Sequence, residues 1–402
     1  MAKIIARSEL KEFKDEIIRR VDRMGRSLRS LSERIFHRPE LGYQEERASA
    51  WVGEFLREAG FRVEMGIAGM KTALRATAGA NSGKGPTVAI LAEYDALPGL
   101  GHACGHNIVG AAAAGAGAAL APLAKAFGGR VMVLGCPAEE GAVEGAGGKA
   151  VMVKHGVFRD VDVAMMIHPA AHTIVESGSM AREALEFRFT GKASHAAAAP
   201  HEGINALDAL IQTFNSINAL RQQLGDEVRV HGIITQGGEA PNIVPERAVG
   251  RFYVRARTKA RLNQVVNQVK DCARGAALAI GAKVEVKRFA HTYENIKVNP
   301  TLVRVFERTL AELGERVTSG RKKGYGSTDM GNVSQVAPAI HPYIAISNRK
   351  VVGHTREFAE AAVSDRGYRG LLVGAKAMAL AALELMASPS LLQQVKDDFQ
   401  AY

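Results

Sequence analysis

The spacing of apolar residues along the chain changes several times, and each change marks a different kind of element. Residues 9–36 and 45–59 have apolar side chains at helical spacing with charged residues between them, so both segments are predicted to be helical. Over residues 86–182, short apolar runs that are typical of buried strands alternate with helical segments. Strands that alternate with helices form parallel sheets covered by helices, so the pattern predicts an α/β fold with a mostly parallel sheet.

A different pattern begins near residue 183, where the predicted strands alternate between apolar and polar side chains. The order over residues 183–294 is strand, helix, strand, strand, helix, strand, which is typical of a split βαβ, ferredoxin-like α+β unit. From residue 295 the first pattern returns and continues into a long helix that ends near Met386. The sequence therefore predicts a discontinuous domain, residues 1–182 and 295–402, with a second domain of residues 183–294 inserted into it.

Composition and charge narrow the class of protein. The chain has 402 residues, of which 47% are hydrophobic and 23% are charged, as expected for a globular protein. Its net charge of +11 could suggest nucleic-acid binding, but the basic residues are dispersed and the densest cluster is only residues 321–323. With 6% aromatic residues and no stacking pattern, we expect no nucleic-acid partner. The positive field favours small anionic substrates instead.

Cysteine usage and the long apolar segments bear on location. The chain has three cysteines, Cys104, Cys136 and Cys272, at irregular spacing. An odd number without regular spacing argues against a disulfide framework and favours a reducing, cytoplasmic environment. The N-terminal segment is charged and lacks the apolar core of a secretory signal. Residues 107–124 are mostly Ala and Gly, whereas a membrane span needs about 20 strongly apolar residues. We therefore expect a buried helix here and no membrane contact.

Side chains that can bind metals or move protons follow several of the predicted strands. Functional groups in open α/β sheets gather at the carboxyl ends of the strands. Some of the candidates lie at strand ends, two open the Ala/Gly-rich helix, and one lies in the loop before the last long helix. The candidates are Asp95, Cys104, His106, Glu139, Glu140, His168 and His354.

Each candidate motif has two interpretations. Adjacent residues at a strand end point in different directions, so one carboxylate of Glu139 and Glu140 can bind a metal while the other faces water. The pair could equally be a solvated turn. Cys104 and His106 could be a buried thiol and a capping histidine, but thiolate with imidazole suits zinc, and imidazole with carboxylate also accepts manganese, cobalt or nickel. The joint placement of four such segments at one edge favours a metal site.

Several long motifs occur in order and cover nearly the whole length of the chain. They are HRPELGYQEERAS, LAEYDALPGLGHACGHN, CPAEEG, MMIHPA, GKASHAAAAPHEGINALDA, GGEAPNIVPE, STDMGNVS and VGHTREFAEAA. In these motifs the chain resembles the M20 metallopeptidase and amidohydrolase family, in particular its aminoacylase-like, amidohydrolase and aminobenzoyl-glutamate hydrolase branch. The resemblance implies a catalytic domain with the fold of metal-dependent exopeptidases and an inserted lid that forms the contact of a homodimer.

The resemblance also implies a site with two divalent metal ions, either zinc or manganese, with cobalt or nickel as further options. Its motifs assign Cys104 as the bridge between the metals and Glu139 as the general base that takes a proton from a metal-bound water. The implied metal ligands are Cys104, His106, Glu140, His168 and His354.

Further residues follow from the same resemblance. His195 in the inserted domain is implied to help bind the substrate carbonyl, commonly in the partner subunit's site, although it could be a helix cap. Asn242 is implied to lie near the substrate, or it satisfies a turn. Asp95 orients a ligand or caps a turn, and Asp329 lines the substrate pocket or caps the next turn. Glu93 stands where many members have a metal-binding histidine, and we interpret it as structural.

These matches imply a hydrolase that cleaves an amide bond between an acyl or aminoacyl group and an amino acid or arylamine. A small substrate with a carboxylate is expected because the chain is basic. The same nucleophile could displace ammonia from an aromatic carbon, so a metal-dependent deaminase is an alternative. A non-catalytic binding protein would be expected to lack Glu139 or several ligands, and none is missing.

Overall fold

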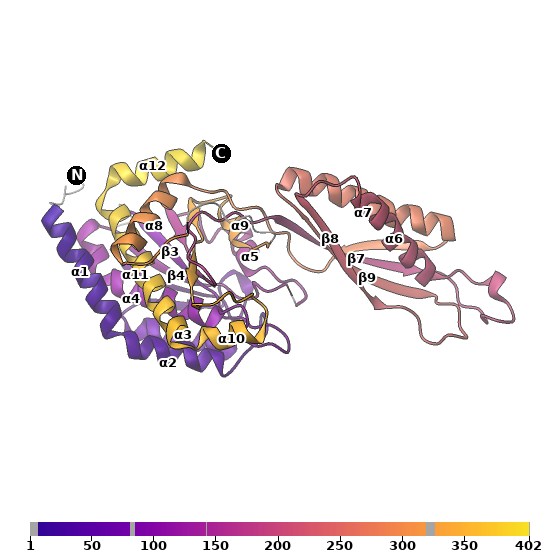
Figure 1. Cartoon of the computed structure of the whole chain (residues 1–402), viewed down its shortest axis with the longest axis horizontal. Helices are drawn as coiled ribbons and strands as arrows, with labels where there is room; N and C mark the ends of the chain where they lie inside the picture. The colour runs from indigo at the N-terminus through magenta and orange to yellow at the C-terminus, as the bar shows by residue number, and fades with distance from the viewer. Residues whose placement is uncertain (1–6, 81–84, 142, 319–325, 402) are drawn as a thin grey trace. The chain divides into compact units, whose positions relative to one another are not determined.

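The computed structural model describes residues 7–80, 85–141, 143–318 and 326–401, which form two compact units (Figure 1). The larger unit includes the described residues of Met1–Gly178, Ile296–Gly324 and Asp329–Tyr402. The smaller unit includes those of Ser179–Asn295 and Tyr325–Thr328, where the sequence predicts an insertion of residues 183–294. The basic cluster at residues 321–323 lies outside the described residues.

A six-stranded sheet forms the centre of the larger unit, in the order β1-β2-β4-β3-β5-β11. Strands β4, β3, β5 and β11 are parallel, which confirms the predicted α/β class, whereas β1 and β2 extend the sheet in antiparallel fashion. Strands β1 and β2 were not predicted; the four residues of β1 are mostly exposed and show no strong alternation. The strands are β1 (Arg62–Met65), β2 (Leu74–Gly79), β3 (Thr87–Ala92), β4 (Arg130–Gly135), β5 (Val163–Met165) and β11 (Ala339–Ile340).

The segment predicted as one strand around MMIHPA is divided between two sheets. Strand β5 stays in the main sheet, and β6 (His168–Ala170) pairs in parallel with β12 (Tyr343–Ala345) as a separate two-stranded sheet. The first predicted helical segment is likewise divided into α1 (Arg7–Arg23) and α2 (Gly25–Phe36). Gly25 opens α2 beside the Tyr368 hydroxyl, which would lie 2.8 Å from a Cβ at this position.

Helices surround the main sheet in Figure 1. Helix α12 (Pro389–Gln400) follows the predicted final helix and begins after Ser388, whose side chain accepts a hydrogen bond from Leu391 N. The remaining helices of the larger unit are α3 (Glu46–Glu58), α4 (His106–Ala124), α5 (Gly148–Lys154), α8 (Pro300–Glu312), α9 (Met330–Val333), α10 (Arg356–Ala362) and α11 (Asp365–Ala387), with short 3-10 turns at Ile67–Gly69 and Lys125–Phe127.

The Ala- and Gly-rich helix α4 is buried in the core, as predicted. A Cβ on Gly117 would lie 2.4 Å from Val133 Cγ2, so small residues let the helix approach the sheet closely. Two segments, His106–Phe127 and Asp365–Ala387, are long and apolar enough to cross a membrane, but 89% and 83% of their apolar stretches are buried inside the fold. Such burial is typical of core helices.

The smaller unit is a four-stranded antiparallel sheet in the order β10-β7-β9-β8, with α6 and α7 on one face (Figure 1). Apolar side chains of β7 and β9, including Phe187 and Phe252, pack against these helices. The order of elements is the predicted split βαβ. The elements are β7 (Ala181–Thr190), α6 (Ala206–Arg221), β8 (Val228–Gln236), β9 (Arg247–Ala256), α7 (Lys259–Ile280) and β10 (Lys283–Arg288), with a 3-10 turn at Pro200–Glu202.

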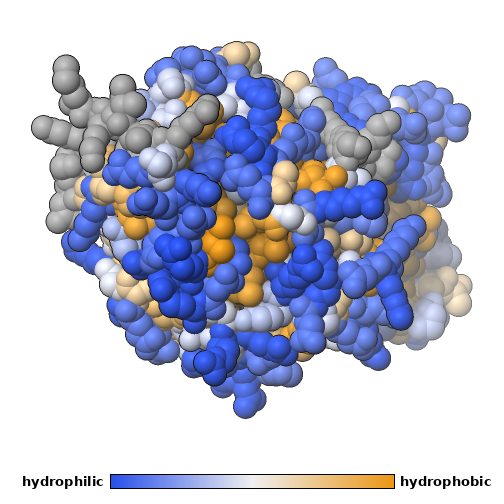
Figure 2. Space-filling model, turned by 60° about the vertical axis from the view of Figure 1, so that its left-hand side comes forward, coloured by the Kyte–Doolittle hydropathy of each residue, from blue (hydrophilic) through white to orange (hydrophobic). Residues whose placement is uncertain are grey.

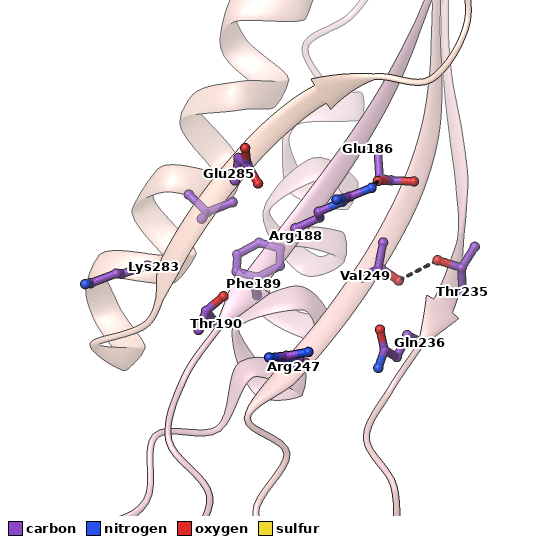
Figure 3. Close-up of a pocket in the computed structure, with 11 residues that line it drawn as sticks. Glu186, Arg188, Phe189, Thr190, Thr235, Gln236, Arg247, Val249, Lys283 and Glu285 are labelled. Atoms are coloured by element: carbon purple, nitrogen blue, oxygen red, sulfur yellow. Dashed lines mark hydrogen bonds and ion pairs between the residues drawn. The ribbon is translucent and has the colours of Figure 1, made fainter. Parts of the chain in front are cut away.

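The other face of this sheet is polar and carries a shallow cavity of 590 Å³ (Figure 3). Its charged side chains pair with one another, because Glu186 lies 2.5 Å from Arg188 and 2.6 Å from Arg251. None of the candidate metal-binding groups among the described residues lies there. The face of the molecule in Figure 2 is also mostly hydrophilic, with small apolar areas between charged side chains.

Candidate active site

The fold brings the metal-ligating candidates of four separate segments to one edge of the larger unit. Glu139 and Glu140 follow β4, and His168 opens β6. Cys104 and His106 lie at the beginning of α4. His354 comes from the loop before α10, where its main-chain N donates a hydrogen bond to Ala103 O at 2.8 Å. Residues that are 250 positions apart therefore meet because strand ends and a helix terminus converge at this edge.

Two groups of three potential ligands share Cys104. The first group is Cys104, His106 and His168, and the second is Cys104, Glu140 and His354. Within each group, one ligand atom from each residue lies within 4.8 Å of the others. Cys104 Sγ is 3.4 Å from His168 Nε2, and His354 Nε2 is 3.7 Å from Glu140 Oε1. A shared thiol between two groups is the arrangement expected of a bridging ligand.

Hydrogen bonds fix which ring nitrogen His106 and His168 present to the site. His106 Nδ1 donates to Asp95 Oδ1 at 2.9 Å, and His168 Nδ1 donates to Pro169 O at 2.8 Å. Because both acceptors are oxygens, the proton of each neutral ring lies on Nδ1. Each Nε2 then carries a lone pair towards the Cys104 side of the site, as in metal sites whose histidines are oriented by carboxylates or carbonyls.

Gly105 connects the two ligands of the HACGHN stretch and lies against the β6 segment. Its φ of 80° is in the left-handed region, and a Cβ there would lie 2.8 Å from Pro169 Cγ. Any other residue would push Cys104 and His106 away from His168. The glycine is thus required by both the turn and the close approach.

The donor set fits divalent metal ions. His106 Nε2 and Glu140 Oε1 are buried, and neither has a hydrogen-bond partner among the described residues. Buried polar atoms are normally hydrogen-bonded, so two such atoms on adjacent segments indicate a ligand that the protein itself does not supply. Thiol, imidazole and carboxylate together are the donors that zinc, manganese and cobalt accept.

Burial governs the electrostatics of the acidic pair. It raises the pKa of Glu139 well above its ordinary value, with further contributions from Glu93 and Glu140, while Lys149 opposes the increase. Burial also raises the pKa of Glu140 and that of the Cys104 thiol. A cation at the site would favour the ionised forms of all three groups.

Asp95 contacts two of the predicted ligands at once. Its Oδ1 accepts from His106 Nδ1, and its Oδ2 accepts from Glu140 N at 2.9 Å. Burial would raise the pKa of Asp95, but its interactions with His106 and with the main-chain N–H of Glu140 bring it below its ordinary value. The carboxylate thus contacts both segments, which is the geometry that the ligand-orienting alternative of the sequence analysis requires.

Asp329 differs from its expected environment. Its side chain does not cap α9, and both of its oxygens are bound by Lys149: Oδ2 accepts from the main-chain N at 2.8 Å, and Oδ1 accepts from Nζ. It is fully buried, so a role in substrate binding stays a prediction that the geometry does not favour. Glu93 is also fully buried, with Oε2 3.3 Å from His106 Nε2 and Oε1 2.5 Å from Lys149 Nζ.

The sequence analysis missed two buried residues that shape this site. Lys149 was not singled out, because a lysine in an amphipathic segment is normally solvated. Glu45 was part of a matching stretch but received no role. Its Oε1 accepts from Ala138 N at 2.8 Å, and its Oε2 accepts from Thr72 Oγ1 at 2.7 Å. Ala138 has φ 55°, so Glu45 holds a strained residue directly before Glu139.

In the smaller unit, the structure brings His195 and Asn242 into neighbouring loops. His195 pairs with Ile243 in an isolated bridge, and Ala196 N donates to Asn242 O at 3.0 Å. His195 Nδ1 accepts hydrogen bonds from Ala197 N at 3.3 Å and Ala198 N at 3.1 Å. The proton of the neutral ring therefore lies on Nε2, which makes this exposed histidine a hydrogen-bond donor.

Comparison with known proteins identifies the family. The dimerisation-domain model of M20 peptidases matches residues 181–280. An Xaa-Arg dipeptidase of Mus musculus is 39% identical over 98% of this chain and 93% of its own length, and the human Xaa-Arg dipeptidase is 38% identical over the same shares. The chain belongs to the M20 family. It is therefore a hydrolase of the M20 peptidase and amidohydrolase type, as the resemblance implied.

Other M20 relatives and solved structures agree with this assignment. A p-aminobenzoyl-glutamate hydrolase polypeptide of Escherichia coli is 29% identical over 92% of this chain and 91% of its own length. A dinuclear metal binding peptidase of the M20 family from Bacillus subtilis superimposes with a TM-score of 0.66 at 22% identity, over 91% of this chain and 99% of the other. A putative aminohydrolase from Staphylococcus aureus superimposes with a TM-score of 0.76 at 21% identity, over 93% of this chain and 100% of the other. These structures share the fold. The relatives' names have amide hydrolysis in common.

Proposed function

We propose that this M20 protein is a two-metal amidohydrolase that cleaves the amide bond of a dipeptide or N-acyl amino acid. The observation that carries the proposal is the position of Cys104, whose thiol belongs to two of the candidate ligand groups among the described residues. One metal would be held by Cys104, His106 and His168, and the other by Cys104, Glu140 and His354. When bound, divalent cations supply Lewis acidity and lower the pKa of water towards neutrality.

Glu139 is the proposed general base. It follows directly in the chain from the strained Ala138 and precedes the ligand Glu140, so its main chain is held on both sides. Its pKa is raised by burial and by two neighbouring carboxylates. A carboxylate of raised pKa can take a proton from the attacking water and return it to the leaving nitrogen near neutral pH.

His195 is proposed to stabilise the negative charge that develops on the substrate carbonyl oxygen. Its Nε2 carries the proton, because two main-chain N–H groups donate to Nδ1. Preoriented donors aimed at a developing oxyanion give large rate effects. Asn242, in the neighbouring loop, is proposed to contact the same substrate.

The smaller unit is proposed to form a homodimer, so that His195 serves the partner's site. His195 lies beyond Thr190 at the far end of β7, whereas the chain enters this unit near Ala181 at the other end. Ten strand residues between these ends span about 33 Å, at about 3.3 Å per residue. The edge strand β8 exposes Ile233 (64%) and Ile234 (44%), which a partner would cover.

The test is metal analysis of the purified full chain, followed by a hydrolysis screen. We expect two divalent metals per chain and release of an amino acid from Xaa-Arg dipeptides first, with N-acyl amino acids and p-aminobenzoyl-glutamate as further substrates. Ammonia release is measured in the same screen, because the alternative is a deaminase. Fewer than two metals in metal-saturated protein, or ammonia without amino-acid release, would refute the proposal.

A further inference from the structure

Among the described residues, the proposed reaction leaves the fully buried ammonium group of Lys149 without a role. Lys149 lies at the beginning of α5 and has no exposed surface. Its Nζ is 2.5 Å from Glu93 Oε1 and also bonds to Asp329 Oδ1. Although burial opposes its charge, Asp329 and Glu93 raise the pKa of Lys149 well above its ordinary value. It is therefore an ammonium ion at neutral pH, in a place where lysine is almost never found without paired charges.

Glu93, Asp329 and Glu139 form an acidic cluster beside the candidate metal centre. One oxygen from each of these three carboxylates lies within 4.8 Å of the others, which is close enough to hold a metal ion. Two of these carboxylates, Glu93 and Asp329, are fully buried and Glu139 is partly buried, so their mutual repulsion calls for a compensating cation. Lys149 already contacts two of its three members.

We propose that Lys149 is the built-in cation of this acidic cluster, which keeps metal ions out of it and so leaves Glu139 uncoordinated. Lys149 is thus a positioning residue that confines divalent metals to the two groups sharing Cys104. The proposal rests on the proposed function in one respect, since it takes Glu139 as the general base.

The chemical reason lies in the lone pairs of the Glu139 carboxylate. A divalent cation bound by the acidic cluster would draw on those lone pairs and make Glu139 a poor proton acceptor. An ammonium ion instead offers only hydrogen-bond donors: Lys149 Nζ donates to Asp329 Oδ1 and forms an ion pair with Glu93 Oε1. The main-chain N of Lys149 also donates to Asp329 Oδ2 at 2.8 Å, so the helix start and the side chain hold the same carboxylate.

The test compares variants of the full chain after saturation with MnCl₂ and removal of the excess metal. Lys149→Ala removes the ammonium and leaves room, Lys149→Met removes the charge but fills the volume, and Lys154→Ala is the control at the exposed end of the same helix. We expect one extra Mn²⁺ per chain in Lys149→Ala, but none in Lys149→Met or Lys154→Ala. Because the extra metal would coordinate Glu139, kcat should fall at least about tenfold in Lys149→Ala, with KM changed by less than about twofold. In Lys149→Met and Lys154→Ala, which gain no metal, kcat should stay close to that of the wild type.

A double variant separates charge from folding. Lys149→Ala with Asp329→Asn removes one carboxylate together with the cation, so it should fold, bind the wild-type number of metals and recover part of the lost kcat. The wild-type metal number in Lys149→Ala would overturn the proposal. A kcat in Lys149→Met as low as that of Lys149→Ala, or a double variant as impaired as Lys149→Ala, would also overturn it, because Lys149 would then act through its charge or through folding and not by excluding metal.

The metal counts distinguish this proposal from the proposed function. A wild-type chain that binds two metals but hydrolyses no substrate contradicts the proposed function, whereas the extra Mn²⁺ of Lys149→Ala can still be counted. Conversely, an active wild-type enzyme whose Lys149→Ala variant gains no metal contradicts only the role of Lys149.

Discussion

The Asp95 carboxylate binds His106 Nδ1 at 2.9 Å through one oxygen and the main-chain N of Glu140 at 2.9 Å through the other. A single buried anion thus orients one ligand from each of the two groups that share Cys104. It sets the proton of the imidazole on Nδ1 and fixes the start of the Glu140 backbone. The two predicted metal positions are therefore coupled through a residue that belongs to neither.

Replacing Asp95 tests this coupling. Asp95→Asn places an amide N–H₂ against either the imidazole N–H or the Glu140 N–H, so one of the two hydrogen bonds is lost. We expect metal affinity to fall about 10- to 100-fold, as with other residues that orient metal ligands. Titration in metal-buffered solution measures it. Unchanged affinity would show that Asp95 has only a structural part.

Cys104→Ala should weaken both metal positions together, because the thiol is common to both groups. Metal content per chain at equal total metal measures the effect, and we expect the loss of more than one equivalent. Cys272→Ser, in α7 of the smaller unit, is the control and should keep the full metal content. Loss of a single metal would argue against a bridging thiol.

Glu139→Gln preserves the size of the side chain and removes its basicity. We expect unchanged metal content and folding with a decrease in turnover of about 10²- to 10⁴-fold, the usual contribution of a general base. Steady-state kinetics on the best substrate of the screen measures it. If the variant keeps most of its turnover, the base must be assigned to another residue.

His195→Ala should lower kcat by about 10²- to 10³-fold without releasing metal, because it removes a donor for the developing oxyanion. His201→Ala, an exposed histidine of the same unit, is the matched control and should be close to wild type. Metal loss in the His195 variant would instead make this histidine a ligand.

The buried carboxyl group of Glu45 predicts an unusual pH dependence of stability. Burial, and then the charge of Asp95, raise its pKa to about 7 from an ordinary 4.5. Between pH 4.5 and about 7, the folded state therefore binds more protons than the unfolded state. The contribution of Glu45 to the free energy of unfolding is then fully present below pH 4.5 and is lost as the pH rises to about 7 and beyond. The loss amounts to about 3 kcal/mol for a shift of this size.

Glu45→Gln can still accept from Ala138 N and donate to Thr72, but it does not titrate. Denaturant unfolding of the metal-free protein at several pH values should show that the stability difference between wild type and this variant decreases by that amount as the pH rises. Glu46→Gln, at the neighbouring exposed position, should show no such trend. A constant difference between wild type and Glu45→Gln would contradict the assignment.

Much of the fold could be predicted because its elements have strong local patterns. The apolar runs of β3 and β4, the small residues of α4 and the alternation of β7 and β9 all follow from the periodicity of helices and strands. The division of residues 163–170 between two sheets did not follow, since one continuous apolar run does not show where a chain changes its partner strand. Strands β1 and β2 were missed because their pairing with each other and with β4, and not their own patterns, makes them strands.

The sequence by itself determined which residue types could bind metals, since Cys104, His106, Glu140, His168 and His354 stand in motifs at predicted strand and helix ends. Only the tertiary structure decided that Cys104 belongs to two groups, that Asp95 orients both of them, and that Lys149 is buried between Glu93 and Asp329. The reason is physical. A side chain's chemistry is local, whereas burial and pairing depend on segments that are distant in the chain and meet only when the sheet and its helices are assembled.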